Sequence, residues 1–179
     1  MEYVTLNSGV KMPMAGIGTF LLTPDEAETS VLSALQNGYR LIDTANAYVN
    51  EKAVGRAMKK SGLPREEIFL ETKLWPAFYE QPDAVEKTLA RLDTDYIDLL
   101  LIHQPAGNYL AGYRLMEQAY EAGKVRAYVT DFANPAVMQL PRAIVIPHLG
   151  ASTAEAEDNC AIMAVQEVMA YLANGEKIH

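Results

Sequence analysis

Four titratable side chains stand where strands of this sequence are expected to end. Asp43 closes a short apolar stretch, and Tyr48 lies in the loop that follows it. Lys73 and His103 close the next two expected strands. Because parallel α/β proteins place their sites at the carboxyl ends of strands, we expect these four side chains to meet on one rim.

Together these residue types suit the delivery of a proton to a carbonyl group. A tyrosine is a poor acid at neutral pH, and a nearby lysine cation favours its phenolate form. A carboxylate paired with the lysine holds the cation in place, and a histidine can orient a carbonyl oxygen or share the proton. None of the four can supply a hydride, so a nicotinamide cofactor is implied. We predict no metal site.

Each residue also has a structural alternative when it is taken alone. The aspartate can cap a helix, the lysine can be a solvated residue on the rim, and the histidine can be part of the core. Their joint occurrence at three consecutive strand ends favours a site.

Expected strands alternate with expected helices along the chain. A hairpin that turns at Gly9 is expected over residues 4–10, and a capping box from Thr23 to Glu26 starts the first helix, which Gly38 ends. Strands are expected at 15–18, 40–44, 68–73, 96–103, 125–130 and 143–146. Further helices are expected at 50–60, 82–92, 109–122 and 153–173.

This alternation predicts an α/β fold with a mostly parallel sheet of about six strands, because strands separated by helices form right-handed parallel units. The chain has 179 residues, whereas an ordinary (β/α)8 barrel takes about 250. The sheet is therefore expected either as half of such a barrel or as an open twisted sheet. The sequence leaves both open.

Composition narrows the class of partner. The chain carries 15 basic and 23 acidic residues, which argues against nucleic-acid binding. No apolar run approaches the roughly 20 residues of a membrane helix, and the N-terminus is too polar for a signal peptide. The lone Cys160 forbids an internal disulfide and fits a reducing compartment. We therefore expect a cytoplasmic protein whose partner is a small molecule, with no nucleic acid and no membrane.

Residues 1–126 closely resemble the aldo-keto reductases. The matching motifs are GIGTF at 16–20, GYRLIDTA at 38–45, YVNE at 48–51, TKLW at 72–75, and DYIDL at 95–99 running into His103. The resemblance implies NADPH-dependent reduction of an aldehyde or ketone to an alcohol, with NADP(H) as cofactor. It also implies that Phe20 and Trp75 line the substrate pocket, although packing in the core explains these two residues equally well.

The same resemblance implies a role for each of the four titratable residues. Tyr48 would be the general acid, and Lys73 with Asp43 would be the pair that tunes it. His103 would orient the carbonyl group of the substrate.

Residues 123–175 resemble a different family, the C-terminal part of D-3-phosphoglycerate dehydrogenase and its 2-hydroxyacid dehydrogenase relatives. The motif is VIPHLGAST at 145–153, followed by Glu155 and the expected long helix. The motif's histidine, here His148, is the catalytic acid/base of that family. The arginine and the glutamate that accompany it there are not found in this sequence.

We therefore interpret the chain as a hybrid of two enzymes. Residues 1–126 would form an aldo-keto-reductase-like partial barrel, and residues 127–179 would form a Rossmann-like β-β-helix tail that completes the same domain. The aldo-keto segments that bind the nicotinamide and grip the adenosine phosphate are not found after residue 126, and a full G-x-G-x-x-G turn is also missing.

Three functions remain open at this point. The first is an NADPH-dependent carbonyl reductase acting on a small molecule. The second is a catalytically inactive scaffold that forms a homodimer through an exposed sheet edge or through its C-terminal helix. The third is residual 2-hydroxyacid dehydrogenase activity through His148.

Overall fold

The computed structural model describes residues 2–6, 9–130 and 144–145. The strands in these ranges form an antiparallel hairpin of β1 (Tyr3–Thr5) with β2 (Lys11–Pro13), and one six-stranded sheet. The sheet consists of β3 (Gly16–Gly18), β4 (Leu41–Asp43), β5 (Phe69–Leu74), β6 (Leu99–Ile102), β7 (Tyr128–Thr130) and β8 (Ile144–Val145). The helices are α1 (Pro24–Gln36), α2 (Glu51–Ser61), α3 (Ala84–Leu92) and α4 (Tyr109–Glu121), with single 3-10 turns at η1 (Asn46–Tyr48), η2 (Arg65–Glu67) and η3 (Pro76–Phe78).

Local signals set the ends of the first two helices, as the sequence predicts. The Thr23 side chain accepts a hydrogen bond from the backbone N–H of Glu26, whose carboxylate accepts one from the backbone N–H of Thr23. Gly38 and Gly62 follow α1 and α2 with φ angles of 92° and 70°. Glycine adopts this left-handed backbone without a steric cost, so both helices end there.

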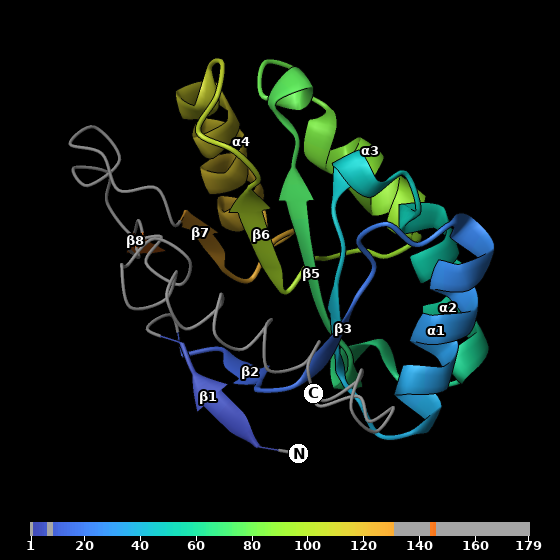
Figure 1. Cartoon of the computed structure of the whole chain (residues 1–179). Coiled ribbons are helices and arrows are strands. Elements are labelled where there is room, and N and C mark those ends of the chain that lie inside the picture. The colour runs from blue at the N-terminus through green and yellow to red at the C-terminus, as the bar shows by residue number, and fades with distance from the viewer. Residues whose placement is uncertain (1, 7–8, 131–143, 146–179) are drawn as a thin grey trace, which may run out of the picture.

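The strands of the sheet are all parallel and lie in the order in which they occur in the chain, β3-β4-β5-β6-β7-β8. A (β/α)8 barrel keeps this order, whereas an open doubly wound sheet reverses it part-way. In Figure 1 the four helices wrap around one side of the sheet. The predicted parallel sheet is confirmed, and its strand order is that of a barrel. The helix predicted at 153–173 lies outside the described residues.

Alternate residues of the strands pack into two separate cores. The outward-facing residues, such as Ile42, Leu70 and Leu100, join the larger core against the helices. The inward-facing Phe69 and Leu99 join a smaller core, which residues of the β1–β2 hairpin region cover. Because side chains alternate along a strand, the odd-numbered residues of β4, β5 and β6 share the inward face.

The differences from the predicted elements concern element ends and single turns. Helix α3 begins at Ala84 rather than at residue 82, and the ladder of the strand predicted at 96–103 covers only Leu99–Ile102, with one isolated bridge from Ile97 to Val125. The 3-10 turns were not predicted, because one turn is too short to produce a periodic pattern. In the part of the chain that the structure describes, no helix has the length and apolarity needed to cross a membrane.

Candidate active site

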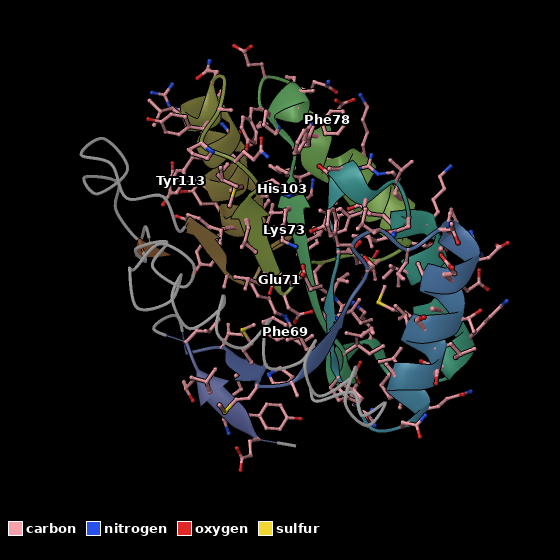
Figure 2. The ribbon with its side chains drawn as sticks, viewed as in Figure 1. Phe69, Glu71, Lys73, Phe78, His103 and Tyr113 are labelled. Carbon is pink, nitrogen blue, oxygen red and sulfur yellow. The ribbon has the colours of Figure 1, made fainter. Side chains whose placement is uncertain are left out.

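Asp43, Lys73 and His103 stand at the ends of three neighbouring strands, on the inward face of the sheet. Asp43 pairs in register with Glu71 of β5, and Lys73 follows Glu71 two residues later on the same face. The backbone N–H of His103 donates to the oxygen of Leu74 at 3.0 Å, which extends the ladder one residue beyond β6. Figure 2 shows Lys73 and His103 near each other at this end of the sheet.

Lys73 makes the contacts that join the cluster. Its ammonium forms an ion pair with Asp43 and donates to the backbone oxygen of Thr44 at 3.0 Å. It also donates to the Tyr48 hydroxyl at 3.5 Å and lies 5.2 Å from the centre of the Tyr48 ring. The Lys73 side chain is 14% exposed and the Asp43 side chain 40%. One enclosed cation therefore contacts a carboxylate and a phenol at the same time.

The 3-10 turn η1 carries Tyr48 to this position directly after β4. The turn ends at Val49, whose φ angle of 59° is an outlier for a β-branched residue and whose side chain is exposed. Strained backbone of this kind persists where surrounding contacts fix it, and it occurs often at functional sites.

Aromatic rings surround the cluster on its open side. The Phe20 ring lies 5.1 Å from the Tyr48 ring, and the Trp75 ring lies 5.1 Å from the His103 imidazole. Tyr48 and His103 meet edge-on, with centroids 5.7 Å apart. Phe20 is largely exposed, so core packing does not account for it. The structure therefore brings the predicted pocket residues together with the predicted catalytic residues.

The surroundings of His103 favour a neutral imidazole. Burial lowers the pKa of His103, the Lys73 cation lowers it further, and the Asp43 carboxylate opposes both effects. A neutral imidazole carries one N–H, which can donate to a carbonyl oxygen. Among the described residues, Nδ1 of His103 has no hydrogen-bond partner.

Glu71 is a titratable residue of this end of the sheet that the sequence analysis missed. Burial raises the pKa of Glu71 to about 7, the neighbouring Asp43 carboxylate raises it as well, and the Lys73 cation opposes both effects. Phe69, Glu71 and Lys73 follow one another along β5 in Figure 2. The two-residue period of a strand was the signal that could have placed Glu71 beside Lys73.

Tyr79 is a second residue that the sequence analysis missed. Its fully buried hydroxyl donates to the backbone oxygen of Gln104 at 2.7 Å and accepts from the backbone N–H of the same residue at 3.2 Å. Gln104 directly follows His103, so this pair of bonds fixes the chain where His103 leaves the sheet. A Cβ at Gly112 would approach the Tyr79 ring to 2.4 Å, which explains the glycine at that position of α4.

The described residues suit the reacting end of a nicotinamide cofactor but not its phosphates. Lys73 is the only lysine or arginine of the described part found in contact with the side chains of Asp43, Tyr48 or His103, and its charge is paired with Asp43. Among the described residues, no second cation lies beside this cluster to hold a diphosphate. Within the same ranges, no three His, Cys, Asp or Glu side chains are grouped to hold a metal ion.

A comparison with protein families identifies the chain. The model of the aldo/keto reductase family matches residues 14–176. The chain belongs to the aldo/keto reductase family. Its parallel α/β sheet is consistent with the (β/α)8 barrel of that family. The match extends across residues 123–175, for which the sequence motif predicted a second family, and nothing in the comparisons indicates a phosphoglycerate dehydrogenase segment.

Individual proteins are similar to the chain as well. The chain is 48% identical over 138 residues to an aldo-keto reductase of Mycobacterium avium (strain 104), covering 73% of this chain and 48% of that protein. It is 45% identical over 131 residues to the glyoxal reductase of Bacillus subtilis (strain 168), a match that covers 70% of this chain and 48% of that protein. The structure of the Bombyx mori aldo-keto reductase in complex with NADP matches 82% of this chain and 56% of that one, with a TM-score of 0.71 and 30% identity.

The chain spans about half the length of the curated relatives that it matches. His148, the predicted acid/base of the second family, lies outside the described residues.

Proposed function

We propose that this aldo/keto reductase reduces a small aldehyde or ketone to an alcohol with NADPH. The observation that carries the proposal is the contact of one ammonium, that of Lys73, with both the Asp43 carboxylate and the Tyr48 hydroxyl. A small dicarbonyl such as glyoxal is the first substrate to test, because a relative that is 45% identical is named glyoxal reductase.

In the proposed reaction Tyr48 donates its hydroxyl proton to the carbonyl oxygen of the substrate. The Lys73 cation stabilises the phenolate that this leaves, and Asp43 holds the cation in position. The neutral His103 donates its N–H to the same carbonyl oxygen and so orients the substrate. NADPH, when bound, supplies the hydride. Phe20 and Trp75 exclude water from one side of the carbonyl group.

We assign no described residue to the binding of the cofactor's phosphates. The described cluster offers one paired cation, so it supports proton delivery and the orientation of the carbonyl group. NADP(H) as cofactor is supported by the family and by the relative that was solved in complex with NADP. Retention of that affinity in this chain is therefore the first property to measure.

The deciding experiment is a titration of the purified protein with NADPH, and with NADH in parallel, following cofactor fluorescence and the emission of Trp75. We expect saturable binding of NADPH in the micromolar range, and NADPH oxidation that depends on added glyoxal. No binding at millimolar cofactor would overturn the proposal. A Trp75→Phe variant is the control for the emission signal, because it removes the only tryptophan of the chain.

A second candidate is the hybrid, an aldo-keto-reductase-like part at 1–126 joined to a dehydrogenase-like tail at 127–179 that folds but does not turn over. The sequence VIPHLGAST at 145–153 and the absence of a second cation beside Lys73 in the described part favour it. Such a chain would form a homodimer through a sheet edge or its C-terminal helix. Gel filtration with light scattering tests the association, and a strict monomer at all concentrations contradicts it.

Residual 2-hydroxyacid dehydrogenase activity is the weakest of the three candidates. Oxidation of a 2-hydroxyacid that is lost in His148→Ala and kept in Tyr48→Phe would favour it over the reductase. For the cell compartment, the cytoplasm stays a prediction that rests on the lone Cys160.

A further inference from the structure

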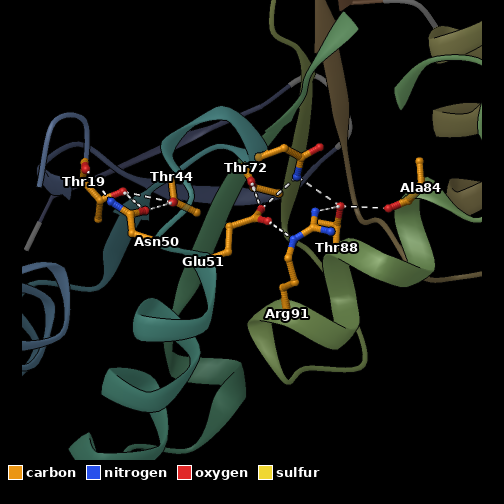
Figure 3. A network of polar contacts seen from close by, with 9 residues as sticks. Thr19, Thr44, Asn50, Glu51, Thr72, Ala84, Thr88 and Arg91 are labelled. Atoms are coloured by element: carbon orange, nitrogen blue, oxygen red, sulfur yellow. Dashed lines mark hydrogen bonds and ion pairs between the residues drawn. The ribbon is translucent and has the colours of Figure 1, made fainter. Parts of the chain in front are cut away.

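A buried carboxylate beneath the site contacts both elements that carry the proposed acid and its cation. Glu51 is the first residue of α2 and is 2% exposed. Its Oε1 accepts a hydrogen bond from the Thr72 hydroxyl at 2.8 Å (Figure 3). The same oxygen accepts another from the Asn46 side-chain amide at 3.0 Å. Its other oxygen accepts from Nε of Arg91 at 2.6 Å.

Both partners of Oε1 are close in sequence to a residue of the site. Thr72 directly precedes Lys73 in β5 and points to the opposite face of the strand. Asn46 is the first residue of η1, the turn whose last residue is Tyr48. One oxygen of Glu51 is thus hydrogen-bonded both to the strand that carries Lys73 and to the turn that carries Tyr48.

The turn that carries Tyr48 has little stabilisation of its own. It is one 3-10 turn, it has no side-chain cap, and it ends in the left-handed backbone of Val49. Besides the contacts of Tyr48 itself, Asn46 anchors the turn: it is buried and donates to Glu51 and, at 3.1 Å, to the Thr88 hydroxyl. Loss of this anchorage would let the turn move relative to β5.

A buried charge is costly unless it is paired, and apolar side chains can often fill the same volume without loss of stability. Stability alone therefore gives little reason to place Glu51 here. Directional hydrogen bonds do what apolar packing does not, because they fix the distance and the angle between the elements that they join.

We propose that Glu51 is a positioning residue for the proton transfer: by binding Thr72 and Asn46 through one oxygen, it sets the separation between the Lys73 ammonium and the Tyr48 hydroxyl. This inference rests on the proposed carbonyl reduction. Glu51 touches none of the site side chains itself, so it acts on the rate of proton transfer and not on the binding of the substrate.

The test removes one bond of the network and keeps the shape of the side chain. In Thr72→Val the donor to Glu51 is lost, and we expect kcat for NADPH-dependent reduction to fall about 10- to 100-fold, because a misplacement of about 1 Å costs about that much. KM should change less than about threefold, and the pH at which kcat is half-maximal should move. Thr72→Ser keeps the hydroxyl and should restore both kcat and the pH profile. Asn46→Ala, which frees the turn, should resemble Thr72→Val.

The matched control is Thr94→Val. At the other end of the sheet, the Thr94 hydroxyl accepts a hydrogen bond from Arg65 at 2.8 Å and donates one to the backbone oxygen of Tyr96 at 3.3 Å, so this variant also loses side-chain hydrogen bonds, but far from Tyr48. The Tm of every variant is measured to show that it is folded. A kcat and pH profile in Thr72→Val that match those of Thr94→Val would overturn the proposal, and so would a Thr72→Ser variant as slow as Thr72→Val.

A readout without turnover separates this proposal from the proposed function. The 13C resonance of Tyr48 Cζ, assigned with Tyr48→Phe, responds to the distance of the Lys73 cation. We expect it to shift in Thr72→Val and in Asn46→Ala but not in Thr94→Val. If the wild-type protein neither binds NADPH nor reduces carbonyls, the proposed function fails. In that case the Tyr48 resonance still tests the positioning role of Glu51. A chemical shift that is unchanged in Thr72→Val and in Asn46→Ala rejects that role.

Discussion

The two ends of the parallel sheet each hold an aspartate paired with at least one cation, and the two clusters differ in how far their charges are satisfied. At the amino end, Asp98 is buried and accepts from Arg65 at 2.8 Å, from Arg126 at 3.2 Å and from the backbone N–H of Leu70 at 3.0 Å. The guanidinium groups of Arg65 and Arg126 each lie over the Tyr96 ring, 4.0 Å from its centre.

At the carboxyl end, one lysine faces two carboxyl groups. Lys73 pairs with Asp43, whose side chain reaches solvent, and the carboxyl group of Glu71 beside them makes no hydrogen bond or ion pair with any described residue. Nδ1 of His103 is also without a partner in the described part of the chain. The fully paired Asp98 carboxylate suits stability, although the Tyr96 hydroxyl beside it is buried without a hydrogen-bond partner among the described residues. The partly exposed Asp43 and its neighbours at the carboxyl end instead leave charges for a ligand.

The largest expected effect tests the carboxyl end. Tyr48→Phe removes the proposed acid and keeps the ring that packs between Phe20 and His103. We expect kcat for carbonyl reduction to fall about 10²- to 10⁴-fold, because that is the usual contribution of a positioned general acid. NADPH affinity and Tm should stay at the wild-type values. Full turnover in Tyr48→Phe would remove the tyrosine from the mechanism.

The second effect tests the amino end. Asp98→Ala leaves two arginines without their common carboxylate, so we expect urea unfolding to show a loss of about 3–5 kcal/mol. Lys87→Ala breaks the pair with Asp83, in which both side chains are more than half exposed, and should cost less than about 1 kcal/mol. The turnover of the folded Asp98→Ala protein should match the wild type. A loss as small as that of Lys87→Ala would mean that the two ends do not differ as described.

Part of the fold and part of the candidate site can be predicted from the sequence. The order of strands and helices, and the glycines that end α1 and α2, follow from local patterns of a few residues. Asp43, Lys73 and His103 could be placed together because strand ends of a parallel sheet share one rim. The strand order then distinguishes the barrel type from the open sheet, which the sequence had left undecided.

The contacts that hold the site in place had no local signal. The bond from Thr72 to Glu51 spans 21 residues, and the bonds between Tyr79 and Gln104 span 25. Such pairs appear only when the chain is folded. Glu71 is different, because its alternation with Lys73 was readable in the sequence, whereas its burial and its raised pKa depend on the neighbouring strand.

The third effect concerns Glu71, whose carboxyl group makes no hydrogen bond or ion pair with any described residue. Burial raises the pKa of Glu71 from 4.5 to about 7, so between these pH values the folded protein holds a proton that the unfolded chain has released. Stability therefore falls as the pH rises through this window. The full loss, at most about 3–4 kcal/mol, is present above pH 7 and absent below about pH 4.5.

Glu71→Gln removes this titration. We expect the variant to be more stable than the wild type at pH 8 by up to that amount, and equal to it at pH 4.5, in urea unfolding at both pH values. Glu66→Gln, which changes an exposed residue, is the matched control and should give the same small difference at both pH values. Equal stabilities of Glu71→Gln and wild type at pH 8 would show that Glu71 carries no unfavourable charge there.

The smallest effect tests whether the loop after β6 is held from outside the site. Tyr79→Phe keeps the packed ring and removes the hydroxyl that binds both backbone groups of Gln104. We expect a stability loss of about 1 kcal/mol and a decrease in kcat/KM of about tenfold, because His103, one residue earlier, loses its fixed position. Tyr39→Phe, in the exposed loop after α1, should change neither. If Tyr79→Phe lowers stability and leaves kcat/KM unchanged, Tyr79 serves the fold in the same way as Asp98, and the division between the two ends of the sheet is less sharp than their charges indicate.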